Sequence, residues 1–212
     1  MIITVDGLDG AGKSTLAKKL AQELGYEYVD KPIYELFNVK GDENYLYNEI
    51  YHIQDLVYNK TNSNILKSYF TGLSLLYIKE CMSQKNLIID RGILSAYAFN
   101  GDKESLPVFE LLIQLGVFFD ASIIVTVSNE ERIKRIKSRD ENDPDLSLDK
   151  IRNLRYDSMK NFIETHPELP CCIINTDGKN PEQVFSEAIT YINSLKTNYR
   201  KVKKRTKETN KD

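Results

Sequence analysis

The chain has 212 residues, of which 41% are hydrophobic, so it can bury one full core. Its three cysteines and two histidines are too few for a disulfide framework or a credible zinc site. The net charge of −2 combines +5 in the segment 197–212 with −7 elsewhere, which argues against a nucleic-acid-binding body. No basic leader precedes the first strand, and no apolar run approaches the roughly 20 residues of a membrane helix. We therefore expect a soluble, cytoplasmic protein.

Short apolar runs alternate with helical patterns along the chain. The strand-like runs are "IITV", "YEYV", "NLIID", "ASIIVTV" and "CCIIN". The first helix follows residue 12, places Leu16, Leu20 and Leu24 on one stripe, and ends at Gly25. The last helix begins at Pro181. This alternation predicts an α/β fold, a three-layer α/β/α sandwich around a five-stranded parallel sheet.

Three segments depart from the alternation. Residues from about 42 to 82 are helical in pattern and rich in tyrosine, and residues 138–147 form a polar stretch typical of an exposed loop. The segment 197–212 carries seven Lys/Arg residues and almost no apolar ones, so we expect it to be disordered. We predict a single domain over residues 1–196, followed by a basic tail.

The segment "GLDGAGKST" at the end of the first strand satisfies the pattern G-x-x-x-x-G-K-[ST] between a strand and a helix. Glycines let backbone N–H groups close around an anion, and the helix N-terminus adds its positive dipole. Lys13, expected to be solvated, would reach the β- and γ-phosphates of ATP, and the Ser14 hydroxyl would ligate Mg²⁺. The predicted nucleotide-binding residues are Gly7, Asp9, Gly10, Ala11, Gly12, Lys13, Ser14 and Thr15.

A charged pair, Asp90 and Arg91, follows directly on the apolar run "LII". Ligands of doubly wound sheets bind at the carboxyl ends of strands, so Asp90 should face Lys13, Ser14 and the Mg²⁺. A metal-bound phosphate would compensate the cost of a carboxylate at a buried strand end. The fork-shaped guanidinium of Arg91 suits a second anion. The alternative is that Asp90 and Arg91 pair with each other.

Three stretches of the chain resemble the thymidylate kinases, within the wider group of P-loop nucleoside and nucleoside-monophosphate kinases. "DGLDGAGKSTLAKKL" looks like the family's P-loop, and "DRGILSAYAFNG" looks like its D-R-x-x-x-S-x-x-A-[FY]-x-G stretch. "INTDGKNPEQVFSEAI" is similar to the closing strand, loop and helix. The resemblance covers all but the tail. It implies a P-loop fold of the nucleotide-kinase type, with a helical acceptor region at about 42–82 and a lid at about 138–147.

The resemblance also implies roles for single residues at the acceptor side. Asp9 would contact the acceptor sugar, Arg91 would hold the acceptor phosphate, and Ser95 belongs to the same stretch. Phe70 would lie on the helix that stacks on the acceptor base.

At the donor side, the resemblance places Arg135 and Arg139 on the approach to the lid, where they would offset the charge of the migrating phosphoryl group. The loop at about 177–179 would border the donor adenine. The predicted catalytic residues are Lys13, Arg91, Asp9, Arg135 and Arg139, and the predicted metal ligands are Ser14 and Asp90.

The chain departs from the family pattern at the acceptor site and in the lid. The second strand leads into "VDKPIYELF" in place of an arginine-bearing or E-P-G-G segment. Asp30 there is similar to the acid that serves deoxynucleoside kinases as a base for the 5′-hydroxyl. Thr71 and Gly72 follow Phe70 where the family has an arginine, and Pro144 replaces a basic lid residue.

The sequence therefore predicts Mg²⁺-dependent transfer of the γ-phosphoryl group of ATP to a nucleoside monophosphate, with dTMP as the preferred candidate. The alternatives are a deoxynucleoside kinase that phosphorylates a 5′-hydroxyl and a nucleotide-binding protein with weak or no kinase activity. A GTPase switch is disfavoured, because the nearest guanine signature, "NKTN", has Asn62 in place of an acid. Apolar residues around 66–81 permit a homodimer.

Overall fold

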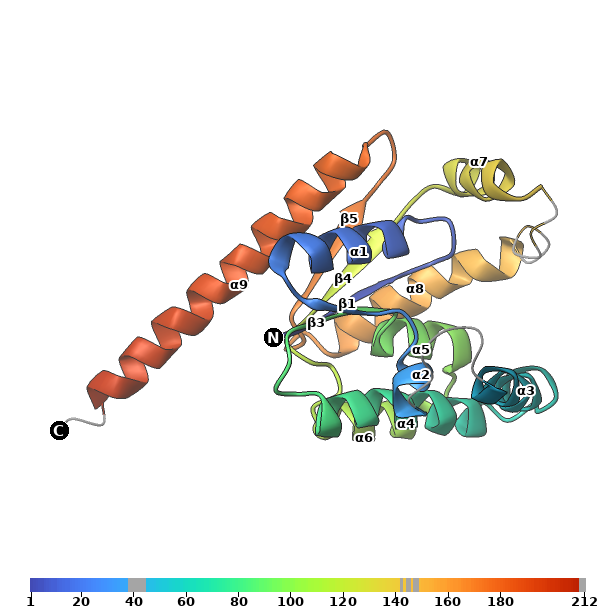
Figure 1. The fold of residues 1–212 in the computed structure, drawn as a ribbon, viewed down its shortest axis with the longest axis horizontal. Coiled ribbons are helices and arrows are strands. Elements are labelled where there is room, and N and C mark those ends of the chain that lie inside the picture. Colours follow the sequence, from blue (N-terminus) through green and yellow to red (C-terminus); the bar gives the residue numbers. More distant parts are fainter. Residues whose placement is uncertain (38–44, 142, 144–145, 147–148, 210–212) are drawn as a thin grey trace.

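The structure is a computed structural model that describes residues 1–37, 45–141, 143, 146 and 149–209, the side chains of 45–47, 149–154 and 198–209 excepted. Strands and helices alternate along it (Figure 1). The strands are β1 (Ile2–Gly7), β2 (Glu27–Val29), β3 (Leu87–Asp90), β4 (Ala121–Thr126) and β5 (Cys171–Asn175). The helices are α1 (Lys13–Leu24), α2 (Pro32–Leu36), α3 (Tyr45–Asn59), α4 (Asn64–Cys81), α5 (Ile93–Asn100), α6 (Leu106–Gln114), α7 (Asn129–Arg139), α8 (Asp149–Thr165) and α9 (Pro181–Thr209).

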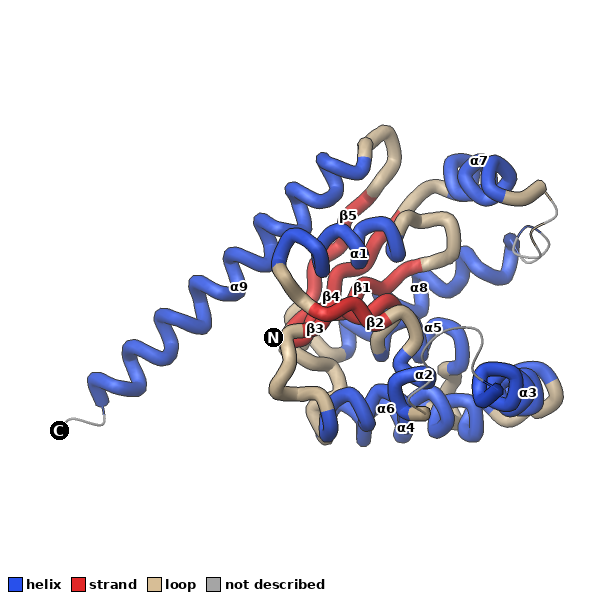
Figure 2. The backbone as a smooth tube through the Cα atoms, viewed as in Figure 1, coloured by secondary structure: helices blue, strands red, loops and turns tan. Residues whose placement is uncertain are grey.

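The five strands form one parallel sheet in the order β2-β3-β1-β4-β5 (Figure 2). β1 lies at its centre, with Val5 opposite Asp90 of β3 and Gly7 opposite Val125 of β4. The segment after β1 therefore begins between the carboxyl ends of two neighbouring strands, as the position of Asp90 in the sequence predicts. The observed architecture is the predicted three-layer sandwich.

Helices cover both faces of the sheet, because alternate residues of each strand point to opposite sides. On one face, Ile3 and Val5 of β1 share a core with Leu20 of α1 and Ile192 of α9. On the other face, residues of α4, α5, α6 and α8 form a second core. No helix within the described residues is long and apolar enough to cross a lipid bilayer.

The predicted helical region at about 42–82 is two helices, α3 and α4, rather than one continuous stretch. Residues 60–63 separate them, and the Ser63 hydroxyl caps α4 by accepting a hydrogen bond of 3.2 Å from the Leu66 amide. Residues 42–44 lie outside the described part of the chain. The Ser63 side chain, which favours the start of a new helix, thus accounts for the break between α3 and α4.

The predicted lid at about 138–147 begins inside α7, whose last residue is Arg139. The Arg139 guanidinium pairs with Asp143, with 2.7 Å between Nη2 and Oδ2. Lid residues 142, 144, 145 and 147 are outside the described residues, and the departure at Pro144 falls among them.

The expected disorder of residues 197–212 differs from the structure, in which α9 continues to Thr209. Figure 1 shows the end of this helix running away from the sheet. Extending an existing helix requires no new nucleation, and the lysine, arginine and glutamate of this segment have favourable helix propensities. A helix can therefore form here without the apolar burial that the sequence lacks. Residues 210–212 lie outside the described chain.

Deleting residues 197–212 should change the melting temperature by less than about 2 °C, since the deleted segment offers almost no apolar surface to bury. Among the described side chains of α9, Ile192 is the last that is fully buried. As a matched control, Ile192→Ala in the full chain should lower the melting temperature by about 5 °C or more. Calorimetry of both variants checks this. A large fall on deletion alone would show that the segment docks on the body.

Candidate active site

The segment between β1 and α1 folds as a phosphate-binding loop. Gly7 has a φ of 140°, and a Cβ there would lie 2.3 Å from the Val125 carbonyl oxygen. Gly10 has a φ of 79°, and its Cβ would lie 2.9 Å from the side chain of Arg132 on α7. Both positions require glycine for conformation and for space. The loop leads into the first turn of α1, so its N–H groups and the helix dipole can act on one anion.

Lys13, the first residue of α1, is buried rather than solvated as the sequence suggests, with 4% of its surface exposed. Its ammonium group donates a 2.8 Å hydrogen bond to the Leu8 carbonyl oxygen and lies 3.8 Å from Asp9 Oδ1. Burial, and next the positive charge of Arg91, lower the pKa of Lys13 to about 8. The loop therefore holds an ammonium group that loses its proton more easily than that of an exposed lysine.

Arg91 reaches this loop from the end of β3. It adopts a φ of 77°, which is uncommon for a residue other than glycine. Its guanidinium pairs with the Asp9 carboxylate and donates to the Gly7 carbonyl oxygen at 3.4 Å. The same group lies 4.9 Å from the centre of the Phe99 ring. The structure thus brings together Lys13, Asp9 and Arg91, three of the five residues that the sequence predicts as catalytic.

Asp90 pairs with Tyr28, whereas the neighbouring Arg91 pairs with Asp9. Its Oδ2 accepts a hydrogen bond of 3.3 Å from the Tyr28 hydroxyl, which also lies 3.2 Å from Asp30 Oδ1. Burial, followed by the charges of the two carboxylates, raises the pKa of Tyr28 well above its usual value. The second carboxylate oxygen of Asp90 is buried and has no hydrogen-bond partner among the described residues.

This buried oxygen is what a metal ligand requires, and it makes the residues present a fit for Mg²⁺. Ser14, whose hydroxyl the sequence assigns to the metal, is exposed in the first turn of α1. No group of three or more histidine, cysteine or acidic side chains within the described ranges could hold a metal ion by itself. An ion held by one serine and one carboxylate takes its remaining ligands from phosphate and water, as Mg²⁺ commonly does.

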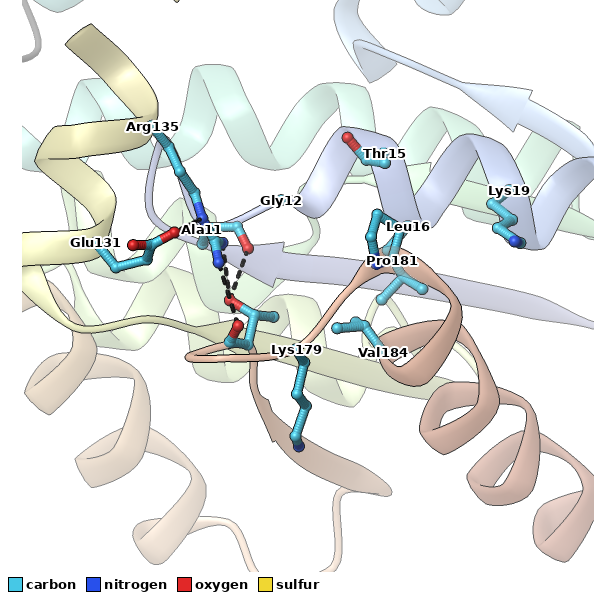
Figure 3. Close-up of a pocket in the computed structure, with 11 residues that line it drawn as sticks. Ala11, Gly12, Thr15, Leu16, Lys19, Glu131, Arg135, Lys179, Pro181 and Val184 are labelled. Carbon is cyan, nitrogen blue, oxygen red and sulfur yellow. Dashed lines mark hydrogen bonds and ion pairs between the residues drawn. The ribbon is translucent and has the colours of Figure 1, made fainter. Parts of the chain in front are cut away.

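A cavity of about 370 Å³ lies beside the loop, between α1, α7 and the segment that precedes α9 (Figure 3). Arg135, which the resemblance places on the approach to the lid, lines this cavity and donates to both the hydroxyl and the carbonyl oxygen of Thr176, at 3.0 and 3.1 Å. Its Nε pairs with Glu131 at 3.0 Å. Lys179 lines the same cavity, where the sequence predicts the adenine-bordering loop. Arg135 therefore lines this cavity together with Ala11, Gly12 and Thr15 of the phosphate loop.

The loop at 177–179 is tied to the start of α7. The Asp177 carboxylate accepts hydrogen bonds from the Ser128 hydroxyl, at 2.8 Å, and from its amide, at 3.0 Å. These bonds lower the pKa of Asp177, with the hydroxyl as the larger cause. The two segments that border the cavity are held as one unit by this carboxylate.

The remaining predicted site residues are less closely associated with the loop. Phe70 packs its ring edge-to-face against Tyr58, with 5.8 Å between centres. The Ser95 hydroxyl is buried with no hydrogen-bond partner in the described chain. Arg139, with 61% of its side chain exposed, pairs with Asp143. The structure does not join Arg139 to the transfer point.

Sequence reasoning missed several side chains at the site. Arg132 of α7 is fully buried against the loop at Gly10, and the Arg155 guanidinium of α8 lies 4.1 Å from the centre of the Phe99 ring. Both are arginines on charged helices, where a solvated side chain is the default expectation. Asp6 is fully buried as well, and it did carry a signal: an acid inside the apolar run of the first strand.

A family model described as an AAA domain matches residues 3–160. The chain belongs to this family. It is 25% identical to a thymidylate kinase of Mycoplasmopsis pulmonis, over 93% of this chain and 89% of that protein. Among solved structures, it resembles the deoxyadenosine kinase from M. mycoides (TM-score 0.62, 22% identity, 92% of this chain and all of that one). It also resembles thymidylate kinase from Candida albicans (TM-score 0.63, 17% identity, 92% of each chain).

These findings confirm the resemblance to the thymidylate kinase-like P-loop nucleotide kinases and the predicted fold class. The protein is a kinase of the nucleoside and nucleotide kinase group. The solved structures are under 25% identical, so they establish the fold and leave the acceptor open.

The kcat/KM for ATP should fall above about pH 8, by about tenfold per pH unit, because the free enzyme then loses the charge of Lys13. Below its lowered pKa the ammonium is present and attracts phosphate. At saturating ATP the bound anion favours the charged form, so the fall in kcat should begin at a higher pH. Initial rates between pH 6.5 and 10 measure both profiles.

Two variants serve as controls for this profile. Lys13→Ala should lose turnover on the order of 10³-fold, since one cation at the transferring group is removed. Lys18→Ala removes an exposed lysine from the same helix and should keep both rate and profile. A flat kcat/KM across this pH range, or normal turnover in Lys13→Ala, would contradict the assignment of the loop as the donor site.

Proposed function

We propose that this protein transfers the γ-phosphoryl group of ATP to a nucleoside monophosphate, with dTMP as the acceptor. The observation that carries the proposal is the position of Arg91, beside Asp9 and the Gly7 carbonyl at the mouth of the phosphate loop. A monophosphate brings about two negative charges to a site that also receives ATP. A planar guanidinium can make two charge-assisted hydrogen bonds to it and offset this repulsion.

ATP would place its phosphates in the loop from Gly7 to Thr15 and its base in the cavity beside Arg135. Lys13 would then exchange its bond to the Leu8 carbonyl for one to the phosphates. Ser14 and Asp90 would hold Mg²⁺, which when bound neutralises charge on the donor phosphates. In this proposal Arg139 would leave the Asp143 carboxylate in order to approach the migrating group.

The acceptor would bind on the opposite side of the loop, between α4 and α5. Asp9 would orient its sugar, Phe70 would contact its base, and the unpartnered Ser95 hydroxyl would donate to it. Catalysis would then consist of positioning and charge neutralisation, without a covalent intermediate. The thymidylate kinase named above as a relative supports dTMP as the first acceptor to test.

A specific contact favours a second candidate, a deoxynucleoside kinase. The Tyr28 hydroxyl lies within 3.3 Å of carboxylate oxygens of both Asp30 and Asp90, so the acid after β2 is linked to the acid that ends β3. In this candidate, a 5′-hydroxyl would approach Asp30 at the carboxyl end of the edge strand β2. With an unphosphorylated acceptor, Asp30 would accept the hydroxyl proton and Arg91 would have no phosphate to hold.

An ADP-release screen over nucleosides and their monophosphates should show the highest rate with dTMP. On that acceptor, Arg91→Ala should raise KM and lower kcat, since both affinity and alignment are lost. Arg91→Lys should recover only part of the lost kcat/KM, because an ammonium group cannot make the two parallel hydrogen bonds of a planar guanidinium. Asp30→Asn should have the smaller effect. If an unphosphorylated nucleoside is the best acceptor and Asp30→Asn is the more damaging change, the second candidate is correct.

We also propose a homodimer formed through α4 and α6. Leu66, Tyr69 and Leu73 of α4 are 47–55% exposed. Leu111 of the adjoining α6 and Leu115, directly after that helix, are 44% and 45% exposed. Leu73→Glu should convert a dimer to a monomer in sedimentation experiments while the circular-dichroism spectrum of the folded chain is kept. The control Ile173→Glu alters an equally exposed residue on the edge strand β5 and should leave the dimer intact. A monomeric parent chain would contradict this.

A further inference from the structure

Asp6, the residue before Gly7 in β1, is fully buried and accepts four hydrogen bonds. An ionised carboxylate away from water is costly unless such bonds replace its hydration. The four distances, 2.7 to 2.8 Å, are short enough for charge-assisted bonds. None of the four donors is in the phosphate loop, so the carboxylate serves another part of the site.

The two carboxylate oxygens have separate partners. Oδ1 accepts from the backbone N–H groups of Gly92, the N-cap of α5, and Ser95, in the first turn of this helix, both at 2.8 Å. Oδ2 accepts from the hydroxyls of Thr4 and Ser122, on β1 and β4. One oxygen therefore anchors the carboxylate to the centre of the sheet, and the other holds the N-terminus of α5 against it, with a favourable contribution from the helix dipole.

Arg91 lies between these attachments. On one side, its amide donates to the Val5 carbonyl oxygen at 3.0 Å, which extends the pairing of β3 with β1. On the other side, the next amide, of Gly92, donates to Asp6. A residue with a side chain at a φ of 77° is disfavoured by about 1 kcal/mol or more, so the surrounding bonds must hold it there. That backbone conformation directs the guanidinium to Asp9.

The packing at Gly92 leaves little room for movement in the joint between β3 and α5, residues 91–92. A Cβ at Gly92 would lie 2.5 Å from Cγ2 of Thr4, whose hydroxyl is itself bonded to Asp6. The start of α5 is thus held directly on β1. A shift of this joint would move Arg91 with respect to the phosphate loop.

We propose that Asp6 is a positioning residue that presets Arg91 for the acceptor phosphate. The inference rests on the proposed function, in which Arg91 binds that phosphate. Asp6 touches neither substrate, but its carboxylate fixes the strained backbone from which the guanidinium extends. Asparagine has the same shape but can accept with one atom only, and its NH₂ group would face donors instead.

The test is the steady-state kinetics of Asp6→Asn with dTMP, or with the best monophosphate of the screen, and with ATP. Because small misplacements of a binding group are costly, the acceptor KM should rise about tenfold or more with a fall in kcat, while the KM for ATP stays within about twofold. A role in stability alone would lower the melting temperature and leave the acceptor KM unchanged.

Ser122→Ala is the matched control, because it removes one bond to Oδ2 and none of the bonds to α5. It should lower the melting temperature but keep the acceptor KM within about twofold of the parent. If Asp6→Asn does not fold, Gly92→Ala takes its place, since its Cβ displaces the same joint from the other side. Gly92→Ala should likewise raise the acceptor KM and leave the KM for ATP within about twofold of the parent.

Arg91→Ala, measured in parallel, separates this inference from the proposed function. A raised acceptor KM in Arg91→Ala together with a parental value in Asp6→Asn, or in Gly92→Ala where that replaces it, would overturn the positioning role alone. A parental acceptor KM in Arg91→Ala would overturn the proposed function, and the inference with it.

Discussion

The Asp6 carboxylate at the carboxyl end of β1 is the interaction on which the rest of the site depends. It joins β1, β4 and the first turn of α5 through four hydrogen bonds with no access to water. The chain leaves β1 directly after it as the phosphate loop, and Arg91 enters from β3 beside it. In the proposed function, the donor and acceptor sides of the transfer would both be built on this point at the centre of the sheet, where parallel strands open toward a ligand.

Charge is the second constraint. Lys13 and Arg91 are close enough that Arg91 contributes to the lowered pKa of Lys13, and Asp9 pairs with Arg91 and lies near Lys13. The Asp9 carboxylate thus partly neutralises the charges of Lys13 and Arg91. In the proposed function, both cations would exchange these contacts for phosphate oxygens, so the charges that phosphoryl transfer requires are already at the site.

The sequence predicted the parts of the site that are set by the chain's local pattern. The loop from Gly7 to Thr15 needs only its glycines and the junction of a strand and a helix, and Asp90 follows from the order of parallel strands. Side chains whose positions depend on how separate helices pack could not be placed, so Arg132 and Arg155 were missed. The helical continuation to Thr209 was missed because the prediction of disorder rested on the lack of apolar residues. A helix that has already formed can continue without burying apolar surface.

The most direct test of this account is a double-mutant cycle between Asp6 and Arg91 on kcat/KM for dTMP. If Asp6 acts through Arg91, the double variant Asp6→Asn/Arg91→Ala should be about as slow as Arg91→Ala alone, because the second change removes what the first one misplaces. Residues that act independently would instead show effects that multiply. A double variant slower than Arg91→Ala by the full factor of Asp6→Asn would contradict the claim that the buried carboxylate serves the acceptor arginine.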